Sequence, residues 1–257
     1  MIDAFGAVLI VLAGIAAGAI NAIVGSGSLV TFPTLLLLGF PPLVANVSNT
    51  VGLVPGSISG VVGYRREMAG QRSRAIPLLV AGGLGGLTGG ILLMALPASA
   101  FERIVPILIL VACVLVAVQP RVSAWILRRR TAAGTDHIGR EGGPILVTTV
   151  FLTGIYGGYF GAAQGVILIA LLAILVDDDL QRLNGLKNAI AVVINAVAGV
   201  IFILIAPVDW RIVGLLATGS IVGGQLGALV GRRLSPFVLR GVIIVVGSVV
   251  AARLLLG

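Results

Sequence analysis

The chain has 257 residues, of which 58% are hydrophobic and 10% are charged, and its formal net charge is +8. A soluble domain contains about 25% charged residues, so this composition excludes an ordinary soluble protein and predicts a protein of the lipid bilayer. The basic residues lie in short segments between apolar stretches, as in the cytoplasmic loops of membrane proteins, so we expect no nucleic-acid binding. One cysteine, Cys113, and one histidine, His137, suggest no metal or catalytic cluster, and we expect no cofactor and no enzymatic activity.

The first half of the chain predicts one interrupted membrane helix followed by three spans. The first arm, residues 4–24, lacks the basic flank of a signal peptide, so we interpret it as a membrane helix. It ends at Gly25-Ser-Gly-Ser28, and the second arm, residues 29–39, follows. At 1.5 Å per residue, that arm covers about 17 Å, roughly half of a hydrocarbon core about 30 Å thick. Spans are expected at 45–64, with a break at Pro55-Gly56, and at 76–96 and 101–118.

The second half of the chain repeats this plan after a polar connector. We divide the chain into a first membrane repeat at 1–118, a basic cytoplasmic connector at 119–143 and a second membrane repeat at 144–257. The elements expected in the second repeat are an arm at 144–163, a short arm at 165–176 and spans at 185–206, 213–231 and 237–256. The spacing of matched residues indicates an internal duplication. Gly14, Gly18 and Gly25 precede Gly154, Gly158 and Gly165 by 140 residues, and Asn49 precedes Asn188 by 139.

The distribution of basic residues predicts how the two repeats cross the membrane. If each interrupted arm pair forms a hairpin that returns to its own side, 14 of the 17 basic residues share one side, in segments 65–74, 119–142, 177–187 and 231–240. If the second hairpin crossed the membrane once instead, 11 basic residues would lie on one side and 6 on the other. The cytoplasmic bias of basic residues favours returning hairpins and gives the repeats opposite orientations. The predicted fold is an all-α polytopic membrane protein with two inverted-topology repeats, each a re-entrant helical hairpin plus three transmembrane helices.

The two hairpin tips are the first candidate site. Each hairpin has about 35 residues, or about 52 Å of helix, so the tips should stop inside the membrane, where irregular backbone is buried or lines a cavity. A helix that starts at such a break presents backbone N–H groups and the positive end of its dipole, which suits an anion. The candidates are Ser26, Gly27 and Ser28 at the first tip and Gln164 and Gly165 at the second. The alternative is that the glycines only permit close helix packing.

Polar residues within the spans are the second candidate group. Lys187 is the only lysine of the chain, and it either contacts the substrate or extends its ammonium to the membrane surface. The asparagines either contact the substrate or join helices, because a buried amide needs hydrogen-bond partners. They are Asn46, Asn49, Asn188 and Asn195.

Other conspicuous residues are interpreted as structural. We expect Asp177–Asp179 to form a solvated cap at the membrane edge rather than a proton relay, and Tyr156, Tyr159 and Phe160 to pack in the interior. The glycines at 82, 86 and 90, and those at 219, 223 and 227, follow the small-residue spacing that is typical of close helix contacts in membranes.

Four stretches resemble the sulfite exporter TauE/SafE family, also called TSUP. They are GIAAGAINAIVGSGSLVTFPTLLLLG at 14–39, residues 46–60, GIYGGYFGAAQGV, and LNGLKNAIAVVINAVAGVIF. The resemblance covers nearly the whole chain and implies an inner-membrane transporter of small anions, often sulfur-containing ones such as sulfite, sulfonates and sulfoacetate. The second tip departs from the family pattern, since Gln164 replaces a glycine and Ala173 stands where Pro33 has its match. This departure bears on the substrate more than on the fold.

These observations predict a secondary transporter that moves a small anion by alternating access at a midplane site. The expected location is the inner membrane, with the basic loops on the cytoplasmic side. The expected partners are the anionic substrate and the lipid bilayer, and a homodimer is an open alternative. A channel-like or structural membrane protein is the main rival interpretation, and a membrane-embedded enzyme is the second.

Overall fold

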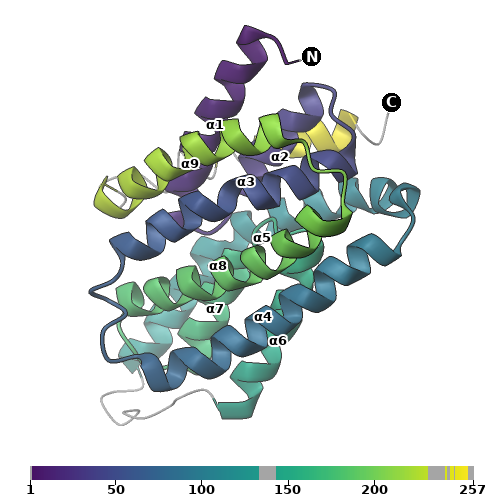
Figure 1. The fold of residues 1–257 in the computed structure, drawn as a ribbon. Coiled ribbons are helices and arrows are strands. Elements are labelled where there is room, and N and C mark those ends of the chain that lie inside the picture. Colours follow the sequence, from purple (N-terminus) through teal and green to yellow (C-terminus); the bar gives the residue numbers. More distant parts are fainter. Residues whose placement is uncertain (1, 133–142, 231–240, 242–243, 246, 254–257) are drawn as a thin grey trace.

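The computed structural model describes residues 2–132, 143–230, 241, 244–245 and 247–253, and within these residues the chain is helical without strands (Figure 1). The helices are α1 (Ala4–Ile23), α2 (Ser28–Leu37), α3 (Pro42–Gly63), α4 (Arg72–Ala95), α5 (Ala98–Ala132), α6 (Gly143–Tyr159), α7 (Gln164–Leu175), α8 (Leu180–Ile205) and α9 (Trp210–Val230). Five of the described segments are long and apolar enough to cross a bilayer: Ala4–Ile23, Arg72–Ala95, Ala98–Val122, Leu180–Ile205 and Trp210–Leu229. The prediction of an all-α polytopic membrane protein is therefore confirmed.

Both interrupted helices of the sequence prediction are interrupted in the structure. α1 ends at Ile23 before α2 begins at Ser28, and α6 ends at Tyr159 before α7 begins at Gln164. The arms are unequal, because α1 has 20 residues and α2 has 10, while α6 has 17 and α7 has 12. At 1.5 Å per residue α1 is about 30 Å long, enough to cross a bilayer alone, whereas α2 covers about 15 Å.

The expected break at Pro55-Gly56 is wrong, because α3 continues from Pro42 to Gly63. Proline is tolerated within membrane helices, where neighbouring helices satisfy the freed backbone groups. Gly56 has a different purpose: a Cβ atom there would lie 2.4 Å from the Cβ of Ser220 in α9. The glycine therefore allows close contact between α3 and α9.

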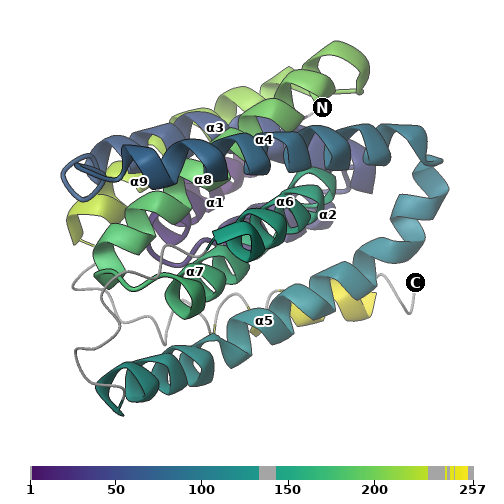
Figure 2. The ribbon, with the colours of Figure 1, turned by 90° about the horizontal axis from the view of Figure 1, so that it is seen from below.

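The polar connector is partly helical, since α5 extends through residues 119–132. Apart from Pro120, that stretch contains good helix formers such as Gln119, Ala124 and several arginines, so its polarity does not end the helix. With 35 residues, α5 is longer than a bilayer crossing requires. It runs along one side of the bundle, apart from the layer that contains α3 and α4 (Figure 2). The remainder of the connector at 133–142, including His137, the basic segment 231–240 and parts of the last predicted span lie outside the described residues.

Helices from the two halves of the chain cross where glycines remove side chains. α1 packs on α9, and α4 packs on α6. A Cβ atom at Gly223 would lie 2.0 Å from the carbonyl oxygen of Ile15, and one at Gly89 would lie 2.1 Å from that of Ile155. The two partner residues, Ile15 and Ile155, are 140 positions apart. Such reciprocal packing is expected of two equivalent halves, while their opposite orientation stays a prediction.

The Asp177–Asp179 segment caps α8, as the sequence suggested, and it also forms ion pairs that the sequence analysis did not predict. Asp179 accepts hydrogen bonds from the backbone N–H groups of Gln181 and Arg182. Asp178 lies 2.8 Å from Nη1 of Arg74, at the start of α4, and 2.9 Å from Nε of Arg182. Burial opposes ionisation of Asp178, but the bonds from Arg74, the Asp179 backbone and Arg182 hold the pKa of this carboxyl below its usual value.

This ion-pair cluster predicts a pH-dependent contribution to stability. Because the pKa of Asp178 is lowered by folding, its contribution is present above the unfolded value of about 4 and is lost as the pH falls through the folded value. Asp178→Asn should lower the free energy of unfolding at pH 7 by about 1 kcal/mol or less, since the groups are partly exposed. Thermal unfolding in detergent, measured from pH 7 downward, should show the variant and the wild type converging below about pH 4. Asp177→Asn is the matched control, because Asp177 is exposed, and an equal loss in this control would contradict the prediction.

Candidate functional site

The two helix breaks meet each other in the interior of the protein. The backbone N–H of Gly165 donates to the carbonyl oxygen of Gly25 at 3.0 Å. A Cβ atom at either glycine would lie 2.5 Å from the Cα of the other, and Gly25 has a φ of +87°, which disfavours any larger residue. The structure thus brings together two stretches that the sequence aligns 140 residues apart.

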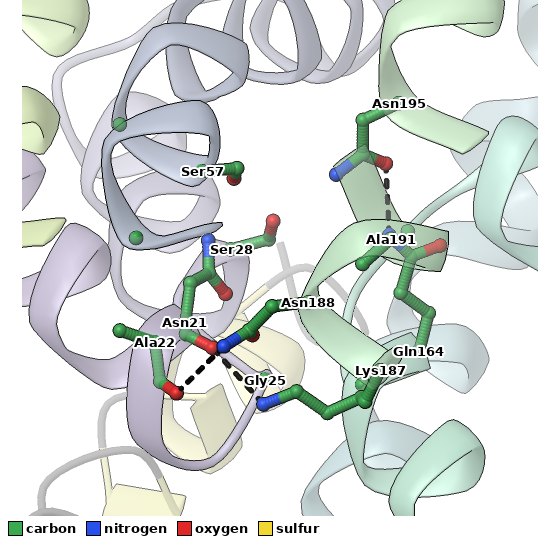
Figure 3. Close-up of a pocket in the computed structure, with 14 residues that line it drawn as sticks. Asn21, Ala22, Gly25, Ser28, Ser57, Gln164, Lys187, Asn188, Ala191 and Asn195 are labelled. Carbon is green, nitrogen blue, oxygen red and sulfur yellow. Dashed lines mark hydrogen bonds between the residues drawn. The ribbon is translucent and has the colours of Figure 1, made fainter. Parts of the chain in front are cut away.

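A small polar pocket lies beside this contact (Figure 3). Its walls come from the end of α1, from α3, from both breaks and from α8 between Lys187 and Asn195. The lining residues are Asn21, Ala22, Gly25, Ser28, Gly56, Ser57, Gly60, Gly161, Gln164, Gly165, Lys187, Asn188, Ala191 and Asn195. The cavity volume is about 20 Å³, roughly the space that one water molecule needs. Side chains must therefore move before a larger molecule enters.

Lys187 is the only lysine of the chain, and its side chain is fully buried, with 0% of its surface exposed. It points across the pocket wall toward the end of α1, where its Nζ donates to the carbonyl oxygen of Asn21 at 3.3 Å (Figure 3). The ion pairs among the described residues all involve Asp178, so no described carboxylate lies within 4.0 Å of Nζ. Its burial and its bond to α1 keep the ammonium inside the protein, and its contact with a substrate stays a prediction.

Side-chain amides surround the same helix end. Nδ2 of Asn184 and Nδ2 of Asn188 each donate to the carbonyl oxygen of Ala22 at 3.2 Å, and Oδ1 of Asn21 accepts from the backbone N–H of Gly27 at 2.7 Å. The last carbonyl groups of a helix have no partner within the helix, and here α8 supplies the donors. Sequence reasoning missed Asn21 and Asn184. Two signals could have identified them. Asn21 is a polar residue in the last turn of an apolar arm, and Asn184 lies three positions before Lys187 on the same helix face.

The opposite wall of the pocket contains a second amide pair. Nε2 of Gln164 donates to Oδ1 of Asn195 at 2.9 Å, which joins the start of α7 to α8 (Figure 3). The other atom of the carboxamide, Oε1, lies against Gly157, where a Cβ atom would be only 1.8 Å away. The glutamine that departs from the family pattern thus lies within the pocket wall, next to a glycine that makes room for it.

The predicted cradle of free backbone N–H groups at the tips is largely absent. The N–H groups of Gln164, Gly165 and Val166 donate to the carbonyl oxygens of Gly161, Gly25 and Ala163. At the first tip, Gly27 donates to Asn21, and Leu29 and Val30 donate to Ser26 and Gly27. These six donors are already used, because the tips fold back as tight turns and contact each other. The pocket-lining group that can carry a positive charge is therefore Lys187 rather than these amides.

Six of the ten candidate residues line the pocket, and four do not. The six are Ser28, Gln164, Gly165, Lys187, Asn188 and Asn195. The others make contacts between elements. Asn46 donates to the carbonyl oxygen of Tyr159 at 3.1 Å, Asn49 accepts from the hydroxyl of Thr31, and Gly27 packs on the backbone of Ala17. Ser26 is buried at 1% exposure and is not among the residues that line the pocket.

The aromatic residues next to the second break pack in the core, as expected. The ring of Phe160 contacts Phe32 edge-on, with centroids 5.4 Å apart, and Phe101 contacts Tyr159 at 5.8 Å. The hydroxyl of Tyr156 donates to the carbonyl oxygen of Ala162 at 2.6 Å and holds the turn in place. These contacts fix the position of the break relative to α2 and α5.

Residues 10–254 match the family described as sulfite exporter TauE/SafE. The chain belongs to this family. Relatives of this TauE/SafE protein include a probable membrane transporter protein of Haemophilus influenzae, which is 24% identical over 241 residues, or 94% of this chain and 91% of the relative. The probable membrane transporter protein ORF9 of Sinorhizobium sp is 23% identical, over 95% of this chain and 90% of its own. The probable membrane transporter protein YfcA of Escherichia coli K12 is 24% identical, over 93% of this chain and 86% of the relative. No solved structure matches the chain.

Proposed function

We propose that this TauE/SafE protein is a secondary transporter that carries a small anion, unchanged, through the pocket between its two helix breaks. The observation that carries the proposal is the ammonium of Lys187, which is buried in the pocket wall without a described carboxylate partner. A buried charge needs an opposite charge or a set of hydrogen bonds, and a bound anion supplies the opposite charge. The names of the family and of the relatives support transport as the activity.

The chemistry of the pocket favours a small oxyanion such as sulfite or a short sulfonate. Asn188, Asn195, Gln164 and Ser28 provide amide and hydroxyl groups that donate hydrogen bonds to oxygen atoms. Sulfur oxyanions offer several acceptor oxygens around one compact centre, which suits such a ring of short polar side chains.

Alternating access is the mechanism that we propose for this pocket. The cavity is too small for a sulfonate as it stands, so the substrate enters only when the helices around it move. The reciprocal pairs α1 with α9 and α4 with α6 are the elements expected to move as units, since their glycine contacts pack them closely. In this mechanism the two halves are inverted repeats that open the pocket to one side of the membrane and then to the other. The basic loops lie on the cytoplasmic side of the inner membrane.

Anion flux in proteoliposomes tests the proposal and separates a transporter from a channel. Uptake of methanesulfonate or sulfite by the wild type should exceed that of empty vesicles and should saturate with concentration. Asn188→Ala should reduce the uptake roughly 10- to 100-fold, because each hydrogen bond to a charged group contributes roughly 1.5–3 kcal/mol. Gln225→Ala is the matched control, since this exposed amide on α9 lies outside the pocket. Uptake that rises linearly without saturation would favour a channel, and uptake equal to that of empty vesicles would exclude these anions as substrates.

A further inference from the structure

The charge balance around Lys187 is unusual for a membrane interior. Its ammonium has one hydrogen bond, to a carbonyl oxygen at the C-terminal end of α1. That end carries the negative pole of the helix dipole, equivalent to about half of an elementary charge, so it offsets the lysine only in part. The neighbouring amides of Asn184 and Asn188 donate their hydrogen atoms to Ala22 and carry no charge.

No charged group from the surrounding helices completes the balance among the described residues. α1 contributes Asp3, which caps the opposite end of that helix and accepts from Gly6. α3 and α7 contain no charged residue, and α6 contributes the tyrosines Tyr156 and Tyr159.

The remaining charged groups near α8 lie at its first turns. α4 contributes Arg72 and Arg74, of which Arg74 is paired with Asp178, as is Arg182 of α8 itself. Glu67 lies beside Gly185 and is outside ion-pair distance of Nζ. Among the residues that the structure describes, protonated Lys187 therefore has no counter-charge, and a ligand in the pocket that it lines is the candidate.

We infer that Lys187 binds a proton together with the transported anion, so that the protein is a proton–anion symporter; this inference rests on the proposed function. An empty pocket is close to neutral when the side chain is an amine, and an occupied pocket is close to neutral when an ammonium faces a monoanion. If the proton or the anion bound without the other, an uncompensated charge would remain in a medium of low dielectric constant, which costs several kcal/mol. Anion and proton affinities are thus linked, each raising the other.

The transport step balances in atoms and charge. One proton from the side of entry forms an N–H bond on the Lys187 amine, the anion binds, and both leave on the other side when that N–H bond breaks. Nothing is oxidised or reduced, and the net charge moved is zero when the substrate is a monoanion. Flux of a monoanion should therefore respond to a pH gradient and not to a membrane potential.

Methanesulfonate is the appropriate probe, because it is the anion of a strong acid and carries no proton of its own near neutral pH. Proteoliposomes with a pH-sensitive dye inside should show internal acidification during methanesulfonate uptake, with one proton for each anion. At equilibrium, each unit of pH gradient should accumulate the anion about tenfold, since one pH unit corresponds to about 1.4 kcal/mol. Empty vesicles and Arg211→Gln proteoliposomes, which lack a positive charge at the exposed start of α9, are the controls.

Lys187→Arg tests the role of the side chain, because a guanidinium keeps its proton at all physiological pH values. This variant should lose gradient-driven accumulation, with an internal-to-external ratio near one, while slow exchange of labelled for unlabelled anion persists. Methanesulfonate uptake by the wild type without acidification, or uptake that follows the membrane potential, would overturn proton coupling and leave anion transport standing. No methanesulfonate uptake by the wild type would overturn both the sulfonate assignment and the coupling.

Discussion

Replacing Gly25 with alanine is expected to lower the free energy of unfolding by about 3 kcal/mol, because the methyl group adds a backbone clash to a conformational cost. The added Cβ would lie 2.5 Å from the Cα of Gly165 and 2.9 Å from its carbonyl carbon, and both are backbone atoms that cannot rotate away. A φ of +87° adds a conformational cost for any residue with a side chain. Thermal or denaturant unfolding in detergent micelles measures the loss.

Gly39→Ala separates the two causes. Gly39 has a similar φ of +84°, but no atom lies within 4 Å of the position that its Cβ would occupy. This variant should lose only the conformational part, about 1–2 kcal/mol. Gly165→Ala should show the part of the stability loss that comes from the clash between the breaks, because its Cβ would lie 2.5 Å from the Cα of Gly25. Equal losses in Gly25→Ala and Gly39→Ala would show that contact between the two breaks contributes nothing.

Replacing Lys187 with methionine is expected to abolish transport without destabilising the fold. Truncating a charge that pairs with a bound anion costs about 2–5 kcal/mol, so flux should fall roughly 100-fold or more. The free energy of unfolding should stay the same or rise, because methionine has a similar shape and removes a buried ionisable group that has one hydrogen bond. Flux in proteoliposomes and unfolding in micelles are measured on the same preparation.

The sign of the stability change distinguishes a binding role from a structural one. If Lys187 only joins α8 to the end of α1, methionine should destabilise the protein by about 1–3 kcal/mol, because the Asn21 carbonyl then loses its donor. Asn184→Leu is a useful comparison, since Asn184 also donates to the end of α1 but does not line the pocket. Wild-type flux in the methionine variant would contradict the proposed site.

Local chemistry explains which features of the fold could be predicted from the sequence. The breaks at Gly25 and Gln164 were predictable, since small and polar residues interrupt apolar arms there. The break expected at Pro55 is absent, because the interior of a membrane protein supports a proline-containing helix through contacts with residues far away in the chain. The extension of α5 past residue 119 was also missed. The polar residues there were interpreted as the end of the helix, although most of them have a high helix propensity.

The candidate site was predicted only in part, because its details depend on tertiary contacts. The two breaks do meet, as the residue register suggested, yet their contact uses the backbone donors that the sequence left free for an anion. Asn184 donates to the carbonyl oxygen of Ala22, which lies 162 positions earlier in the chain, and no local pattern predicts that contact. Asn46 and Asn49 bind other helices instead of lining the pocket, a choice that the sequence left open.

A crystal structure with selenite is the most direct test of the proposed site, because selenium scatters anomalously and selenite has the shape of sulfite. The anion should bind within about 3 Å of Nζ of Lys187, with the amides of Asn188, Asn195 or Gln164 turned toward it and the pocket widened. The same crystals of Lys187→Met should show no anomalous peak there. Selenite bound only to arginines at the membrane surface, with the pocket closed around Lys187, would contradict the proposal that this pocket is the anion site.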